Sequence, residues 1–166
     1  MSAVSKIAMM CALTATLLSG CAGRYLQSDV IHSDAKIRKS ADAQAVIELV
    51  ETYERAMGER DHSTLIRLVS RDYYENAGTT HTTEDDYGYD GVVLLFEALT
   101  RHVIEARVDV KVREVRVYGE RADVLFEYAY TMHYKIGEAR RWQTQRDVNR
   151  IQLQREDGEW RIVSGL

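Results

Sequence analysis

Four side chains between residues 81 and 133 are candidates for proton transfer in a cavity. They are His81, Asp86, Asp90 and His133. A histidine beside a carboxylate can serve as a general acid and base, provided that both groups face the same cavity. No motif forces any of these residues to pair, and His133, which alternates with sheet residues, equally fits a packed or surface histidine. His133, Asp90 and His81 are therefore the catalytic candidates, and a non-catalytic protein is the main expectation.

A partial calcium-loop pattern overlaps the same stretch. Asp86, Asp90, Gly91 and Glu97 correspond to the first, fifth, sixth and twelfth loop positions, but Gly88 at the third position offers no side-chain oxygen. Asp90 as a helix cap and Glu97 as a solvated helical residue explain the same letters. We expect no metal site and no cofactor.

The chain contains 10 tyrosines, whose apolar rings and polar tips suit either a wet cavity or a protein interface. Tyr128 and Tyr130 stand at strand spacing. Packing in the core or an interface is the main interpretation for this pair, and ligand contact is the alternative. The arginines are typical of solvated strand faces, and a net charge of −4 argues against a nucleic-acid binder.

Helical spacing of apolar residues predicts three helices that would position these side chains. The first runs from about Asp42 to Met57, with Gly58 as its C-terminal stop. Asp61 can cap a short second helix, after which residues 71–75 predict a short strand. The third helix opens at Asp90 and Gly91, and its expected buried stripe consists of Val92, Leu95, Phe96, Leu99 and Val103.

From Arg107 onward the apolar residues alternate with the period of a strand. The alternation changes phase near Arg113 and Glu114, which predicts a bulge and a bent strand. Asp157 and Gly158 predict a hairpin turn before the last strand. Helices followed by such a meander predict an α+β fold, with N-terminal helices packed on a strongly bent mixed or antiparallel sheet.

The order of these elements resembles the nuclear transport factor 2-like (SnoaL-like) superfamily. Two segments carry the resemblance in detail, residues 53–61 (YERAMGERD) and residues 155–163 (REDGEWRIV). The resemblance implies a cone-shaped domain over residues 41–166. Members of the superfamily include enzymes, ligand-binding modules and partners of larger assemblies, so the fold does not name an activity.

The steroid isomerases of this superfamily allow a comparison residue by residue. Their tyrosine donor matches Tyr53, but their catalytic base falls on Ala77 and their second acid on Asn149. The resemblance therefore implies no proton-abstracting carboxylate here, although Tyr53 and Asn149 remain able to orient a polar ligand. Glu75 could replace the base only if this alignment were shifted.

The N-terminus resembles a bacterial lipoprotein signal. Lys6 precedes an apolar run too short to span a bilayer, and the run ends in Leu18-Ser19-Gly20-Cys21. The resemblance implies that residues 1–20 are removed and that Cys21 carries lipid. Residues 21–40 would then form the lipidated cysteine and a flexible tether.

The residue after the lipidated cysteine bears on localisation. In Gram-negative lipoproteins an aspartate at this place favours retention in the inner membrane, and here the residue is Ala22. The resemblance thus implies an envelope protein, at the outer membrane and facing the periplasm if the source is Gram-negative.

The combined expectation is a membrane-anchored envelope lipoprotein with one domain that binds a small hydrophobic or polar molecule, or a protein partner, without catalysis. The binding candidates are Tyr53, Asn149, Tyr128 and Tyr130, and the membrane contact is Cys21. Relatives suggest a homodimer through the open sheet face. The alternative is a SnoaL-like isomerase or hydro-lyase, which would need a histidine and a carboxylate facing the cavity.

Overall fold

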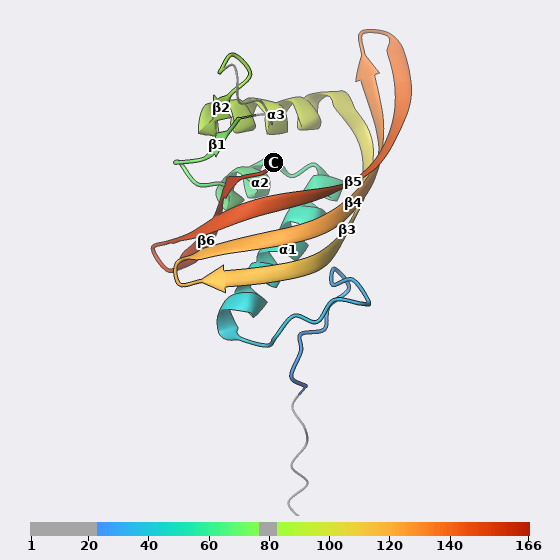
Figure 1. The fold of residues 1–166 in the computed structure, drawn as a ribbon. Coiled ribbons are helices and arrows are strands. Elements are labelled where there is room, and N and C mark those ends of the chain that lie inside the picture. The colour runs from blue at the N-terminus through green and yellow to red at the C-terminus, as the bar shows by residue number, and fades with distance from the viewer. Residues whose placement is uncertain (1–22, 77–82) are drawn as a thin grey trace, which may run out of the picture.

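The computed structural model describes residues 23–76 and 83–166, and it places three helices on one face of a curved sheet (Figure 1). The predicted α+β class is confirmed. None of the helices in this part of the chain is long and apolar enough to cross a membrane. The elements are α1 (Ala41–Glu59), α2 (His62–Leu68), β1 (Tyr74–Glu75), β2 (Tyr87–Gly88), α3 (Tyr89–His102), β3 (Val103–Tyr118), β4 (Arg121–Ile136), β5 (Ala139–Glu156) and β6 (Glu159–Ser164).

Helix α1 begins where its sequence offers a cap. The Ser40 hydroxyl accepts a hydrogen bond from the Ala43 N–H at 3.0 Å. The helix continues through Gly58, so the stop predicted there is wrong. It ends at Glu59 and is followed by the C-cap Arg60, whose φ of 58° is left-handed and whose side chain donates to the Val103 carbonyl at 2.6 Å. That long-range contact holds a conformation in which glycine is usually found.

Helices α2 and α3 follow the predicted order with differences at the start of α3. Asp61 caps α2 by accepting from the Thr64 N–H at 3.1 Å, as expected. Gly88, and not Asp90, is the N-cap of α3, and no side chain caps this helix. The predicted buried stripe is wrong at Leu95, whose side chain is 53% exposed.

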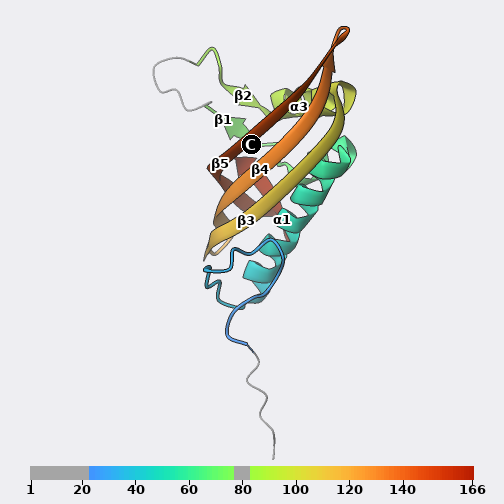
Figure 2. The same cartoon turned by 90° about the vertical axis from the view of Figure 1, so that its right-hand side faces the viewer.

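Strands β3 to β6 form an antiparallel sheet in chain order, and β1 pairs with β2 apart from it. The register shifts between Val112 and Glu114, which confirms the predicted bulge. The turn between β5 and β6 has positive φ at Asp157 and Gly158, as the hairpin prediction requires. Figure 2 shows the strands curving around α1. The bend makes the inner face concave.

The core lies between the helices and this concave face. α1 contributes Val46 and Val50, and α2 contributes Leu65, all at most 1% exposed. The sheet side consists mainly of branched aliphatic residues with the same low exposure: Val110, Val112, Val124, Ile151, Leu153 and Ile162. Packing of this kind, without a cysteine in the described residues, stabilises the domain.

Residues 24–39, which we call the N-terminal strap, pack along the free edge of β3. The Val30 carbonyl accepts from the Val112 N–H at 2.6 Å, and the His32 N–H donates to the Val112 carbonyl at 2.9 Å. Val30 and Ile37 are 3% and 4% exposed. This differs from the flexible tether expected from the sequence, because the polar composition of the strap hides two apolar residues that the core buries.

Candidate functional site

A cavity of about 260 Å³ lies between α1 and the concave face of the sheet. Its described lining is almost entirely apolar or aromatic and contains no charged side chain. The lining residues are Tyr53, Met57, Val108, Val110, Phe126, Tyr128, Tyr130, Met132, Asn149 and Leu166. A small, apolar cavity with few polar groups is typical of a site for a small molecule.

Helix α1 contributes the cavity wall through two residues one turn apart, Tyr53 and Met57. The neighbouring Glu54 fixes this part of the helix against the sheet, because its carboxylate accepts from the Val110 N–H at 2.8 Å. Val110 itself lines the cavity. The hydrogen bond therefore sets the distance between the two walls.

The Tyr53 hydroxyl is the unusual polar group of the site. It has no hydrogen-bond partner among residues 23–76 and 83–166. Burial, with smaller contributions from Tyr128 and Tyr87, raises its pKa from 10.0 to about 12. At neutral pH it is a phenol that can donate a hydrogen bond to a ligand.

The rings of Tyr128 and Tyr130 form the sheet side of the cavity. They stack with a centroid distance of 6.0 Å and an interplanar angle of 2°. Gln145 binds both hydroxyls: its amide nitrogen donates to the Tyr128 hydroxyl at 3.1 Å, and its amide oxygen accepts from the Tyr130 hydroxyl at 2.7 Å. With their hydroxyls engaged by β5, the two residues offer a ligand mainly their ring surface.

Asn149 on β5 and Leu166 mark another part of the wall. The Asn149 amide donates to the Gly165 carbonyl at 2.9 Å, and its oxygen accepts from the Arg150 N–H at 2.7 Å. One amide hydrogen remains for a ligand. Gly165 adopts a φ of 95°, and a Cβ there would lie 2.1 Å from the Arg150 carbonyl oxygen, so only glycine fits this approach.

Leu166 is held in the wall by two tyrosine side chains, Tyr73 directly before β1 and Tyr87 on β2. Its N–H donates to the Tyr73 hydroxyl at 3.0 Å, and its carbonyl accepts from the Tyr87 hydroxyl at 2.7 Å. The Glu75 carboxylate accepts from the Gly165 N–H at 2.7 Å. Desolvation raises the pKa of both tyrosines. These contacts make Leu166 a fixed part of the cavity.

Comparison with known proteins places this architecture in a family. Residues 42–165 match the sequence model of the calcium/calmodulin dependent protein kinase II association domain family. The chain belongs to this family. No curated protein matches the chain significantly.

Solved structures show that this association-domain family member has the nuclear transport factor 2-like fold expected from the sequence. It is similar to a nuclear transport factor 2-like superfamily protein from Salmonella enterica, with a TM-score of 0.55, 16% identity, and 74% of this chain and 86% of that chain covered. The low identity shows the fold alone.

Two further structures bear names that concern catalysis. A putative scytalone dehydratase from Novosphingobium aromaticivorans has a TM-score of 0.62 and 12% identity, covering 75% of this chain and 80% of that chain. A ketosteroid isomerase-like protein from Erwinia carotovora atroseptica has a TM-score of 0.61 and 14% identity, covering 76% and 95%. Both structures share the fold with this association-domain family member. Sequence identities this low show the fold alone and carry no information about a shared reaction.

The structure brings all four predicted binding residues into one cavity, namely Tyr53, Tyr128, Tyr130 and Asn149. Sequence reasoning did not select Met57 and Met132, which share their walls. Both could have been found by extension, because Met57 follows Tyr53 by one helical turn and Met132 follows Tyr130 on the same strand face.

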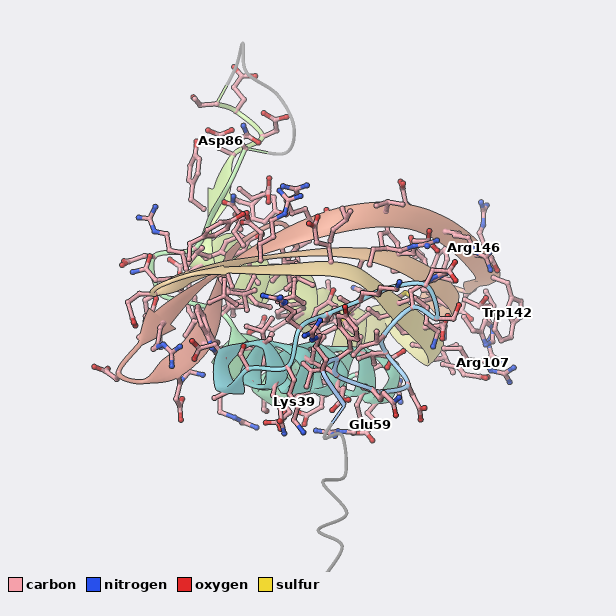
Figure 3. The ribbon with its side chains drawn as sticks, turned by 60° about the horizontal axis from the view of Figure 1, so that its bottom comes forward. Lys39, Glu59, Asp86, Arg107, Trp142 and Arg146 are labelled. Atoms are coloured by element: carbon pink, nitrogen blue, oxygen red, sulfur yellow. The ribbon has the colours of Figure 1, made fainter. Side chains whose placement is uncertain are left out.

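The described catalytic candidates do not meet in this cavity. His133 lies on the outer face of the sheet, stacked on Trp142 at 4.5 Å between ring centroids. Asp90 is exposed in the first turn of α3. Asp86 hydrogen-bonds to the Tyr74 hydroxyl, and Figure 3 shows it far from Trp142. The described candidates therefore do not form the histidine–carboxylate pair that the enzyme alternative would need, because alternation along β4 turns His133 outward.

Four expectations concern other parts of the chain or other chemistry. Cys21 and His81 lie outside the described residues, as does Ala77. The calcium-loop pattern is not a loop in the structure, since Asp90 to Glu97 belong to α3. Helical backbone cannot wrap a cation as a calcium loop does.

Proposed function

We propose that this protein binds a small, uncharged molecule in the cavity between α1 and the sheet, without catalysing a reaction. The observation that carries the proposal is an apolar, aromatic lining with one unpartnered hydroxyl, that of Tyr53. This hydroxyl has no protein partner in the described residues, so a ligand oxygen that accepts from it would add a hydrogen bond in a largely apolar surrounding. An ion would lose its hydration there without a compensating charge.

The same lining argues against the isomerase or hydro-lyase alternative. General acid–base catalysis needs a titratable group within reach of the reacting atom, usually a histidine or a carboxylate. The described lining contains neither. Glu75 lines a neighbouring depression together with Asn149, and its carboxylate already accepts a hydrogen bond from the Gly165 N–H. We therefore propose binding and no turnover.

The two cavity methionines allow a direct test. In the full chain with methyl-labelled methionine, titration with acetophenone, which pairs an aromatic ring with one carbonyl acceptor, should shift the NMR signals of Met57 and Met132. The titration uses the unprocessed chain, in which Met1, Met9 and Met10 provide controls within the same spectrum. Signals of Met57 and Met132 that stay unchanged up to the solubility limit of acetophenone would refute the proposal.

We further propose that lipid on Cys21 anchors the protein in the cell envelope, at the outer membrane and facing the periplasm in a Gram-negative source. Support comes from the apolar run and the residues around Cys21. Cys21→Ser should move the protein from the membrane fraction to the soluble fraction and abolish labelling by palmitate. Cys11→Ser, the matched control, should remain lipidated, and equal behaviour of the two variants would contradict the anchor.

A second proposed role is self-association through the outer face of the sheet, in line with the family's description as an association domain. Trp142 and Val148 are 58% and 52% exposed there, and Figure 3 shows Trp142 and Arg146 at the same end of the sheet. Exposed aromatic and arginine side chains are typical of interfaces. Acidic Asp109 on β3 shares a row with Arg146 on β5, so two copies could pair opposite charges.

Sedimentation analysis tests this second role. The full chain should form dimers, and Trp142→Glu should convert them to monomers. Leu94→Glu, on an equally exposed apolar side chain of α3, should leave the dimer intact. A full chain that is monomeric at all concentrations would exclude self-association through this face.

A further inference from the structure

An open groove of about 570 Å³ continues from the cavity toward the β4–β5 hairpin. Tyr130 and Met132 line both spaces, so the groove and the cavity meet at these two side chains. Gln143, which also lines the groove, donates to the Tyr130 hydroxyl at 3.2 Å and keeps the ring in place. The cavity and the groove therefore adjoin at these two side chains.

The walls of the groove come from α3 and from the hairpin. Figures 1 and 2 show the hairpin projecting beside the end of α3. Leu95 and Ile136 lie on the two walls and are 53% and 66% exposed. Large apolar side chains exposed on both sides of one groove mark a binding surface more strongly than single ones do.

The groove lacks the groups that would bind an anion or a cation tightly. Its described lining contains no lysine, arginine or carboxylate, and His102 is its only titratable side chain apart from tyrosines. The described cavity lining likewise contains no charged side chain. A carboxylate or phosphate would therefore meet no lysine or arginine side chain at either place.

We propose that the cavity and the groove together bind one elongated, uncharged amphiphile. Its compact end carries an oxygen that accepts from the Tyr53 hydroxyl, and its aliphatic tail runs over Met132 between Leu95 and Ile136. The inference rests on the proposed cavity function and extends it to a ligand class. From Tyr130 to Ile136 the strand advances roughly 20 Å, at about 3.3 Å per residue, which leaves room for a long tail.

Acetophenone and its para-butyl and para-hexyl derivatives test the tail. Their dissociation constants for the full chain are measured by calorimetry. We expect affinity to rise about twofold per methylene, about half the fourfold gain of complete burial, because the groove stays open on one side. The double variant Leu95→Ser/Ile136→Ser should lose about tenfold in affinity for the hexyl compound and keep its affinity for acetophenone.

Leu94→Ser is the matched control, since Leu94 is 65% exposed on α3 but does not line the groove. It should bind all three compounds as the wild type does. Equal affinity for the three compounds in the wild type would overturn the groove while leaving the cavity function intact. Failure of the wild type to bind acetophenone would overturn both the groove and the cavity function. If Leu94→Ser lost as much affinity for the hexyl compound as the double variant, the tail would bind non-specifically and the groove would be overturned.

Discussion

At the scale of single residues, one hydroxyl decides what the cavity accepts. Tyr53 contributes a donor, while the hydroxyls of Tyr128 and Tyr130 are already engaged by Gln145. The sequence predicted these tyrosines and Asn149 as candidates through spacing and family resemblance. It did not predict which hydroxyls would be free, because that depends on which β5 side chains lie opposite β4.

Tyr53→Phe separates binding from stability. Loss of the donor should weaken acetophenone binding by about two- to tenfold, the range of one net hydrogen bond. The midpoint of thermal unfolding should not fall, because the hydroxyl has no partner in the described part of the unliganded protein. Tyr118→Phe, at an exposed position on β3, is the control and should bind like the wild type.

The raised pKa of Tyr53 predicts a specific alkaline sensitivity. Between pH 10 and pH 12 the unfolded chain releases the Tyr53 proton while the folded chain, with its pKa of about 12, retains it. The folded state then binds more protons, so its free energy of unfolding falls as pH rises through this window. Tyr53→Phe should show a shallower fall in urea titrations, whereas a slope equal to that of the wild type would contradict the assignment.

At the scale of elements, the predicted helices and strands are largely confirmed, and the errors have local physical causes. Gly58 did not end α1, because Arg60 obtains a long-range hydrogen bond that compensates for its left-handed backbone. Leu95 matched the helical period of α3 but faces the groove, where the core does not reach it. Periodicity detects an apolar face without showing what covers it.

The N-terminal strap is the part of the fold that the polar composition of residues 24–39 did not predict. Val30→Ala should lower the free energy of unfolding by about 2 kcal/mol, because it removes two buried carbons beside the β3 edge. Lys36→Ala, at an exposed position in the strap, should change it by less than about 0.5 kcal/mol. Urea denaturation measures both, and equal stability of the two variants would mean that the strap is not part of the folded unit.

At the scale of the whole molecule, helices, sheet and strap share one core, so the domain should unfold in one cooperative step. The two tryptophans report on it differently, since Trp160 is 6% exposed and Trp142 is 58% exposed. In Trp142→Phe the remaining emission should shift to the red on unfolding, with the same urea midpoint as far-UV circular dichroism. Different midpoints would reveal a part that unfolds separately.

The packed strap also limits the distance between the domain and a membrane to which Cys21 would be anchored. If Cys21 carries lipid, only Ala22 and Gly23 separate it from the strap. A fully extended chain covers about 3.5 Å per residue, so the three steps from residue 21 to residue 24 span at most roughly 10 Å. A flexible linker of nearly twenty residues would let the domain reorient freely above the membrane. So short a linker would instead restrict the tilt of the domain and keep one of its ends close to the lipid headgroups.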